Sequence, residues 1–213
     1  VAKSWWGGTQ NDAYKDLYHL NPSDIAANSA RSNYPLGTNS GSKFNNGSIK
    51  VGNNTYKTEY NGLCFEPLDE YKGDFARAYL YMFTCYENLS WTGTNAPNMI
   101  VANETYPMLK SWAKDLLVEW SRKDPVSEKE RNRAEAIYKI QQNRNPYIDY
   151  PELVEYLWGN KVGQAFTTNQ TDPVITAPAN NSTIQLPNTH YTSPSKTEIQ
   201  VLAKRLTADL TLS

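Results

Sequence analysis

Apolar residues recur at intervals of three and four positions in several stretches of the chain, which predicts helices that bury one face. The clearest stretch covers residues 65–88, where Tyr71, Phe75 and Met82 fall on one side. Pro67 near its start, followed by two acidic residues, is typical of a helix N-terminus. We therefore predict a core-facing helix over residues 65–88.

Three further helices are predicted after this one. Leucine and tryptophan recur at helical spacing over residues 106–121, which indicates a second packed helix. Ser127 and Glu130 have the spacing of a capping box, so the next helix is expected to begin there. It is expected to end before Pro146, and a last short helix is predicted over residues 151–158.

Residues 37–62 are rich in Gly, Asn, Ser and Thr, and polar and apolar positions alternate within them. The dipeptide Asn46-Gly47 is a strong signal for a tight hairpin turn. We expect Ile49 in the returning strand and Tyr56 in the strand after it. This segment is predicted to form a small β-meander.

The composition changes after Gly159. Residues 161–182 lack a helical period and are rich in Thr, Asn and Pro, which indicates a linker. Residues 183–213 resemble the opening part of a small secreted β-sandwich module, which is expected to be incomplete. Strand character is found at residues 184–186, 198–201 and 206–212. The predicted organisation is an α+β domain over residues 1–160, then the linker, then the partial β module.

Composition and charge limit the classes of function. Of 213 residues, 39% are hydrophobic and 12% aromatic, so the chain can bury a core and disorder is not expected. The net charge of −1 counts against nucleic-acid binding through overall charge, so such binding would depend on local cations. No apolar run approaches the ~20 residues of a membrane span. Cys64 and Cys85 could form one disulfide or stay free.

Residues 16–37 carry the most informative polar pattern. After Pro22, either a serine or Asp24 can cap a short helix. On that helix Asp24, Asn28 and Arg31 are spaced so that their side chains share one face. A carboxylate, a carboxamide oxygen and a guanidinium together suit a hard cation and the phosphate that it carries. The alternative is a capping acid beside a solvated amide and a surface arginine.

The same segment, DLYHLNPSD followed by AANSARSNYPLG, resembles the hallmark of the bacterial endonuclease I family of secreted or periplasmic nucleases. Three further stretches match this family in the same order: AKSWWGG, FEPLDEYKGDFARAYLYM and DPVSEKERNRAEAIYKIQQNRNPYIDYPE. The matches run from the first residues to about Trp158. The chain departs from the family pattern at Gln142, where glycine is usual.

This resemblance implies a mainly helical nuclease domain with a ββα-metal (His-Me finger) active site. Asn28 occupies the position of the family's metal-binding asparagine, and the expected ion is Mg²⁺, or alternatively Mn²⁺ or Ca²⁺. The family's general-base histidine, with its neighbouring glutamate, would lie about two residues before Val1. We therefore expect a truncated domain that is weakly active or inactive as it stands, from a secreted or periplasmic bacterial protein.

Other residues are candidates for roles beside Asn28. Arg31 is a candidate for neutralising the phosphate, and Arg77 is a weaker one. The alternative for Arg77 is a structural salt bridge with Asp74, three residues away. His19 could replace the missing base, although a histidine beside apolar neighbours is more often packed and hydrogen-bonded.

Two acids could hold the water molecules of the cation, namely Asp24 and Glu66, and the alternative for Glu66 is an acid favoured by a helix N-terminus. The third predicted helix carries a run of basic residues that would suit a phosphate track or, more commonly, a solvated face. The run consists of Lys129, Arg131, Arg133, Lys139 and Arg144.

Two functions of different classes remain open from the sequence. The first is a metal-dependent, largely sequence-nonspecific endonuclease acting on DNA and possibly RNA, since no element is shaped to distinguish base edges. The second is a non-catalytic module of a secreted multidomain protein that binds nucleic acid or another polyanion.

Overall fold

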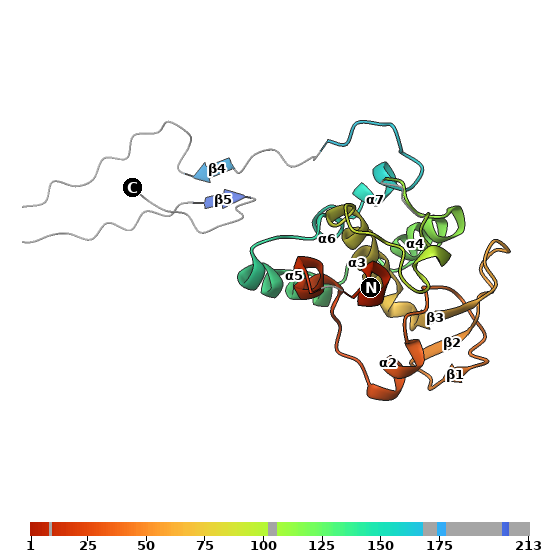
Figure 1. The fold of residues 1–213 in the computed structure, drawn as a ribbon. Helices are drawn as coiled ribbons and strands as arrows, with labels where there is room; N and C mark the ends of the chain where they lie inside the picture. Colours follow the sequence, from red (N-terminus) through yellow and green to blue (C-terminus); the bar gives the residue numbers. More distant parts are fainter. Residues whose placement is uncertain (9, 102–105, 168–173, 178–201, 205–213) are drawn as a thin grey trace, which may run out of the picture. The chain divides into compact units, whose positions relative to one another are not determined.

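The computed structural model describes residues 1–213 except 9, 102–105, 168–173, 178–201 and 205–213. The chain divides into two compact units, Val1–Phe166 and Thr167–Ser213. The first unit contains η1 (Lys3–Trp6), α1 (Asp12–Lys15), η2 (Leu17–His19), α2 (Ile25–Arg31), β1 (Phe44–Asn45), β2 (Ile49–Asn53), β3 (Leu63–Pro67), η3 (Asp69–Tyr71), α3 (Lys72–Cys85), η4 (Ala96–Asn98), α4 (Ser111–Lys123), α5 (Glu128–Gln141), α6 (Pro146–Asp149) and α7 (Leu153–Leu157), where η denotes a 3₁₀-helix (Figure 1). This is an α+β fold.

The second unit contains one antiparallel pair of strands, β4 (Val174–Ala177) and β5 (Leu202–Lys204). Strand β4 falls inside the stretch that the composition had indicated as a linker. The strands expected at residues 184–186, 198–201 and 206–212 lie outside the described residues. No helix in the part of the chain that the structure describes is long and apolar enough to cross a bilayer.

Strands β1, β2 and β3 form an antiparallel meander in that order. The hairpin predicted at Asn46-Gly47 is confirmed: Gly47 has a φ of +85°, and Val51 of β2 pairs with Phe44 of β1. The expectation that Tyr56 lies in the next strand is wrong. The Asn54 side chain donates a hydrogen bond to the Tyr56 carbonyl, 2.8 Å away, and holds this segment as a loop before β3.

The helix predicted over residues 65–88 begins later, because the first part of that stretch is strand β3. Phe65 pairs with Val51 of β2, and its backbone N–H donates to the carbonyl of Pro35 at 2.8 Å. Pro67 then keeps the residue before it out of the helical region of backbone conformation. Helix α3 therefore starts at Lys72, and its apolar side is as predicted.

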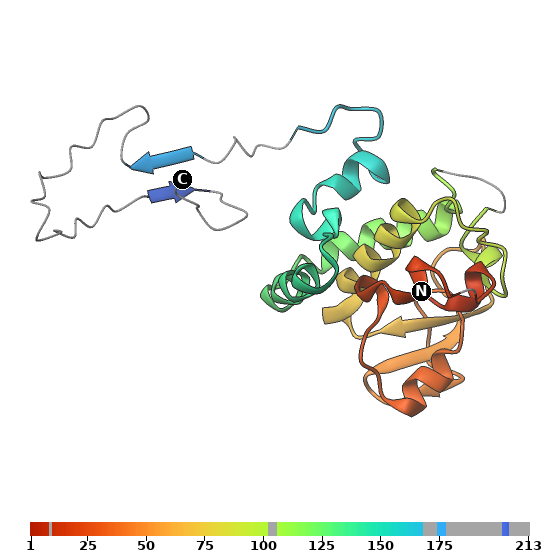
Figure 2. The same ribbon diagram turned by 60° about the vertical axis from the view of Figure 1, so that its left-hand side comes forward.

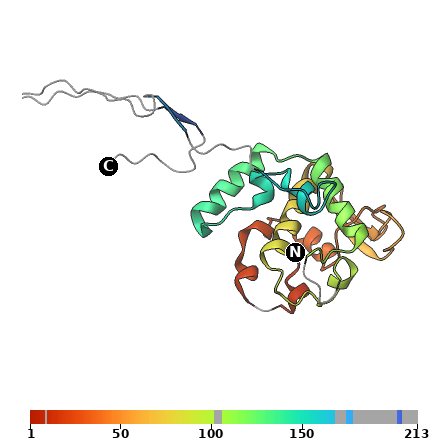
Figure 3. The same cartoon turned by 90° about the horizontal axis from the view of Figure 1, so that it is seen from above.

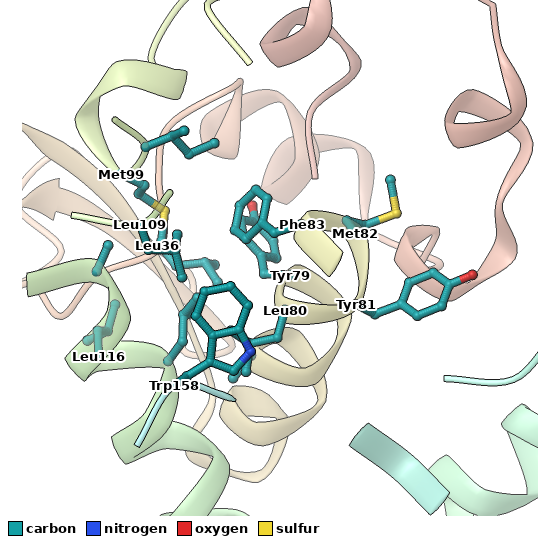
Figure 4. Packing of buried hydrophobic residues seen from close by; sticks show 14 of the residues in the cluster. Leu36, Tyr79, Leu80, Tyr81, Met82, Phe83, Met99, Leu109, Leu116 and Trp158 are labelled. Carbon is teal, nitrogen blue, oxygen red and sulfur yellow. The ribbon is translucent and has the colours of Figure 1, made fainter. Parts of the chain in front are cut away.

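Helix α3 lies at the centre of the first unit, and α4, α6 and η2 pack around it (Figures 1 and 2). Its Tyr79 and Phe83 rings meet edge to face with centroids 6.0 Å apart, as Figure 4 shows. Leu116 of α4 and Trp158 lie together on one side of α3, whereas Tyr81 points away from them. The core thus surrounds α3, and it fixes the elements that face the site.

The remaining helix boundaries follow from local geometry. Helix α4 begins at Ser111 rather than at residue 106, because Leu109 forms an isolated antiparallel bridge with Ile100. Helix α5 begins as predicted, with the Ser127 hydroxyl accepting a hydrogen bond from the Glu130 N–H at 3.1 Å. It ends at Gln141, and the next residue, Gln142, has a φ of +59°, a left-handed conformation that favours glycine.

The segment that carries η2 leads along the chain into α2. Helix α2 contacts strand β2, and η2 contacts α5, which runs beside it in Figure 3. Among the described residues no strand precedes α2, so a ββα unit ending in α2 is not seen. That part of the fold prediction stays a prediction.

Candidate active site

A cavity of about 870 Å³ opens beside α2. It is lined by one face of α2, by η2 and the residues after it, by the turn of the β1–β2 hairpin, and by the first turns of α3 and α5. We call it the α2 cavity. Val1 also lines it, so the cavity collects segments that are far apart in the sequence.

Helix α2 is positioned by its cap and by one buried residue. The Asp24 carboxylate accepts a hydrogen bond from the Ala27 N–H at 2.9 Å, which confirms Asp24 as the capping residue. Ala27 is buried against the core, which turns the next helix position outward. Asn28 is therefore exposed and lines the α2 cavity. Its carboxamide makes no hydrogen bond within the described chain.

Arg31 lines the same cavity one turn after Asn28. Its guanidinium donates to the Tyr79 hydroxyl at 2.9 Å and lies 5.6 Å from the centroid of the Phe65 ring. Its Nε is buried without a hydrogen-bond partner among the described residues. No carboxylate of that part of the chain forms an ion pair with it. The guanidinium of Arg31 is therefore held in the cavity by uncharged groups and is available to bind an anion.

His19 also lines the α2 cavity, but both of its nitrogens are engaged. Nε2 lies 2.7 Å from the Ala13 carbonyl oxygen, so this nitrogen must carry the proton and donate. Nδ1 lies 3.4 Å from the backbone nitrogen of Val1. Burial lowers the pKa of His19 to about 4. This geometry fits the packed, hydrogen-bonded alternative and does not support His19 as the base.

Arg77 is fully buried and does not line the α2 cavity. Its Nε and one terminal nitrogen donate to the Glu130 carboxylate at 2.7 and 2.6 Å, and the other terminal nitrogen donates to the Asp124 carbonyl at 2.8 Å. It also pairs with Asp74 at 3.2 Å. The salt-bridge interpretation therefore holds, and a role for Arg77 on a bound phosphate does not fit its position.

The partners of Arg77 form part of the cavity wall, because Asp74 and Glu130 both line the α2 cavity. Burial, together with the negative charge of Glu130, raises the pKa of Asp74 to about 6. The capping box predicted at Ser127 is therefore only half formed. The Glu130 carboxylate accepts hydrogen bonds from Arg77 and not from the backbone at the start of α5. One of the two negative charges on this wall is offset by the buried guanidinium of Arg77.

Glu66 lies on the opposite face of strand β3 from Phe65 and does not line the α2 cavity. Its carboxylate accepts from the Asn39 N–H at 2.8 Å and from the Lys72 ammonium at 2.7 Å. It faces a separate hollow of about 350 Å³. The prediction that Glu66 assists a cation at Asn28 is therefore not supported, whereas Asp24 does line the α2 cavity.

The predicted basic run divides into three kinds of residue. Lys129 and Arg133 line the α2 cavity, and Arg133 donates to the Leu20 carbonyl at 2.6 Å. Arg144 is neutralised by ion pairs with two acids and lies outside the cavity. Arg131 and Lys139 are exposed and also lie outside it. Only the N-terminal part of this run can contribute to a phosphate track in the α2 cavity.

The sequence model of the family described as Endonuclease I matches residues 1–152. The chain belongs to the endonuclease I family. This confirms the resemblance, which the motifs had extended to about Trp158.

Characterised relatives carry nuclease names. The chain is 37% identical over 152 residues to the extracellular ribonucleases of Bacillus subtilis (strain 168) and of Bacillus amyloliquefaciens, covering 71% of this chain and 49% of each relative. It is 28% identical over 133 residues to Endonuclease-1 of Buchnera aphidicola, covering 62% of this chain and 44% of that protein. The chain thus spans about half the length of the curated relatives it matches.

Within this family framework, the oxygen donors at α2 suit an ion that keeps much of its water. The described residues contain no group of three or more His, Cys, Asp or Glu that could hold a metal ion. The Asn28 carboxamide oxygen is available, and Asp24 has one carboxylate oxygen outside its cap hydrogen bond. Mg²⁺ retains several waters and binds through few protein oxygens, so this donor set fits it.

Two residues that hold parts of the cavity wall in place were not identified from sequence patterns. Tyr79 orients Arg31, although its spacing in α3 marks it only as a core residue. Asp16 is buried and accepts hydrogen bonds from Tyr81 at 2.6 Å and Tyr86 at 2.8 Å, which anchors the segment leading into η2. The cysteines, for which a disulfide had stayed open, are both free thiols.

Proposed function

We propose that this chain provides the metal-binding and phosphate-binding part of a divalent-metal-dependent, largely sequence-nonspecific endonuclease that hydrolyses phosphodiester bonds of DNA or RNA. The observation that carries the proposal is the pairing of an unbonded carboxamide, Asn28, with an unpaired guanidinium, Arg31, on one face of α2 and in one cavity. Family membership and the names of the relatives support it.

In this proposal the side chains of α2 divide the work. Asn28 ligates the ion through its carboxamide oxygen, and Arg31 donates its remaining N–H groups to a phosphate oxygen. A bound Mg²⁺ would supply positive charge to the phosphate and to the leaving oxygen. Asp24 contributes a further oxygen for the waters of the ion. The ion could also be Mn²⁺ or Ca²⁺, both of which accept oxygen ligands.

The general base in this proposal is the histidine of the family pattern, in a segment before Val1, and α2 is the helix of a ββα-metal site. Val1 lines the α2 cavity, and its backbone nitrogen lies 3.4 Å from His19 Nδ1, so a residue attached to this nitrogen would join the chain at the cavity. We also propose that the protein is secreted, as the names of its extracellular relatives suggest.

Plasmid nicking tests this function on two proteins, the chain as printed and the chain extended by the residues that precede Val1 in its gene. We expect the extended protein to nick plasmid in Mg²⁺ and not in EDTA, and the printed chain to be weak or inactive. A general base is worth about 10²–10⁴ in rate, which sets the expected difference. Nicking that is insensitive to EDTA would contradict the metal dependence.

Asn28→Ala tests the ligand within the extended protein. We expect lost nicking with an unchanged unfolding temperature, because Asn28 is exposed and makes no hydrogen bond in the described chain. Asn132→Ala is the matched control, since Asn132 is an exposed asparagine of α5 outside the cavity. Nicking at the parental rate in Asn28→Ala would show that Asn28 is not the ligand. Retained nucleic-acid binding without nicking in the extended parent would favour the non-catalytic binding module instead.

A further inference from the structure

Besides Tyr18, three aromatic side chains line the α2 cavity. Phe65 comes from β3, and Tyr71 and Phe75 are one turn apart where α3 begins. The centroids of the Phe65 and Phe75 rings are 5.7 Å apart, and the ring planes are inclined by 59°. We call these three side chains the aromatic strip. Tyr71 and Phe75 are half-buried and can present ring surface to the cavity, whereas Phe65 is buried.

A cation stands at each end of the aromatic strip. Arg31 Cζ lies 5.6 Å from the centroid of Phe65, and Lys129 Nζ lies 4.3 Å from the centroid of Tyr71. Within the described ranges, neither cation is in an ion pair with a carboxylate. Both line the α2 cavity. The arrangement is therefore aromatic surface between two positive charges that are not neutralised.

The nearby acids do not cancel these charges. Asp74 and Glu130, which share the wall with Lys129, are directed to the buried Arg77 at 3.2 and 2.6 Å. Arg77 offsets one of their two negative charges, and Arg133, which also lines the cavity and is in no ion pair among the described residues, offsets the other. The cavity can attract a polyanion although the whole chain has a net charge of −1.

We propose that the aromatic strip stacks an unpaired nucleobase, with its neighbouring phosphates at Arg31 and Lys129, so that the site selects single-stranded nucleic acid over duplex. The inference rests on the proposed nuclease function and names its substrate class. A base offers its face to a protein ring only when it is not stacked within a duplex. Stacking on aromatic side chains tolerates any base, so this selection agrees with sequence-nonspecific cleavage.

The test measures binding of the full printed chain in EDTA, by fluorescence anisotropy, to a labelled short oligothymidylate. A second probe has the same length and phosphates but only abasic sites, and a third is the duplex of the same length. We expect the oligothymidylate to bind about tenfold or more tightly than the abasic probe, since one stacked base contributes roughly 1–3 kcal/mol. We expect the duplex to bind more weakly than the single strand at equal concentration of phosphates.

Variants at Tyr71 locate the effect on the strip. Tyr71→Leu should reduce the ratio of base-bearing to abasic affinity to about threefold or less, whereas Tyr71→Phe should keep it, because the ring does the stacking. Tyr138→Leu is the matched control: Tyr138 lies on α5 with Arg144 5.4 Å from its ring, outside the cavity, and should keep the ratio. The comparison of the base-bearing and abasic probes on the parent chain needs no variant. The proposal therefore stays testable even if Tyr71→Leu does not fold.

Equal affinity of the parent chain for the base-bearing and abasic probes would overturn the stacking proposal, and so would tighter binding of the duplex. Plasmid nicking by the extended protein reports on the proposed function separately. Nicking without base-dependent binding would overturn the stacking proposal and leave the proposed nuclease function standing. Base-dependent binding without nicking would support the stacking proposal and overturn the proposed nuclease function.

Discussion

Glu130→Gln should destabilise the protein more than any comparable change on the surface of α5. Glu130 is 5% exposed, and its carboxylate is the main counter-charge of Arg77, which is 0% exposed. The substitution preserves the shape of the side chain and one acceptor oxygen, but it removes the closest counter-charge and leaves Asp74 as the carboxylate paired with the buried guanidinium. The loss therefore comes from a buried charge that is less well compensated.

The magnitude follows from the burial of the pair. Removing one partner of a buried ion pair costs about 3–5 kcal/mol, and we expect the lower end because Arg77 keeps two partners. For a unit of this size, one kcal/mol shifts the unfolding temperature by roughly 2–4 °C, so the midpoint should fall by roughly 6–12 °C. Thermal and urea unfolding at neutral pH, followed by circular dichroism, measure both quantities.

Glu135→Gln is the matched control on the same helix. Glu135 pairs with Arg144 at 2.8 Å, but its side chain is 57% exposed and Arg144 also pairs with Asp149. An exposed pair of this kind contributes about 0–1 kcal/mol. If Glu130→Gln cost no more than Glu135→Gln, Arg77 would not depend on Glu130, and a role for Arg77 outside the fold would reopen. Replacing Arg77 and Glu130 together by Met and Leu should recover most of the loss.

Three further predictions concern the cavity and the end of α5. Arg31→Met should weaken binding of the oligothymidylate by about tenfold or more and make it less sensitive to salt, because a charge-assisted contact to phosphate is lost; Arg131→Met, at an exposed position outside the cavity, should change affinity by less than about threefold. Asp74→Asn should gain stability relative to the parent as the pH rises from 4 to 7. Burial raises the pKa of Asp74 to about 6, so between these pH values the folded parent holds a proton that the unfolded chain has released, and the parent loses stability. Urea midpoints of the two proteins that change with pH in parallel would contradict this. Gln142→Gly should raise stability by about 1 kcal/mol, because Gln142 has a φ of +59° and glycine adopts it without strain; an unchanged or lower unfolding temperature would contradict it.

Features that depend on neighbours in the sequence were predictable. The cap at Asp24, the cap at Ser127 and the turn at Asn46-Gly47 each require only residues within three positions, and all are found. The placement of Asn28 on an open face of α2 follows from the same local periodicity.

Features that depend on packing between distant elements were not predictable. The first residues of the stretch 65–88 fit a helix or a strand by spacing alone, and only their pairing with β2 decides for the strand. For Arg77 the phosphate role stayed open beside the salt bridge with Asp74, because its decisive partner, Glu130, lies 53 residues away on another helix. Tyr79, which fixes Arg31, is 48 residues from it. A pattern of neighbouring residues cannot reveal contacts between positions so far apart in the sequence.

Two side chains of α5 hydrogen-bond to the backbone of η2 and the residue after it, and this has a consequence for how the site assembles. Gln141 accepts from the Leu17 N–H at 3.0 Å across 124 positions of sequence, and Arg133 donates to the carbonyls at both ends of that turn. One wall of the cavity is therefore complete only after α5 has docked. Local unfolding of η2 alone would leave these side chains without partners, so the Leu17 amide should exchange its hydrogen with solvent together with the helices and not with the loops.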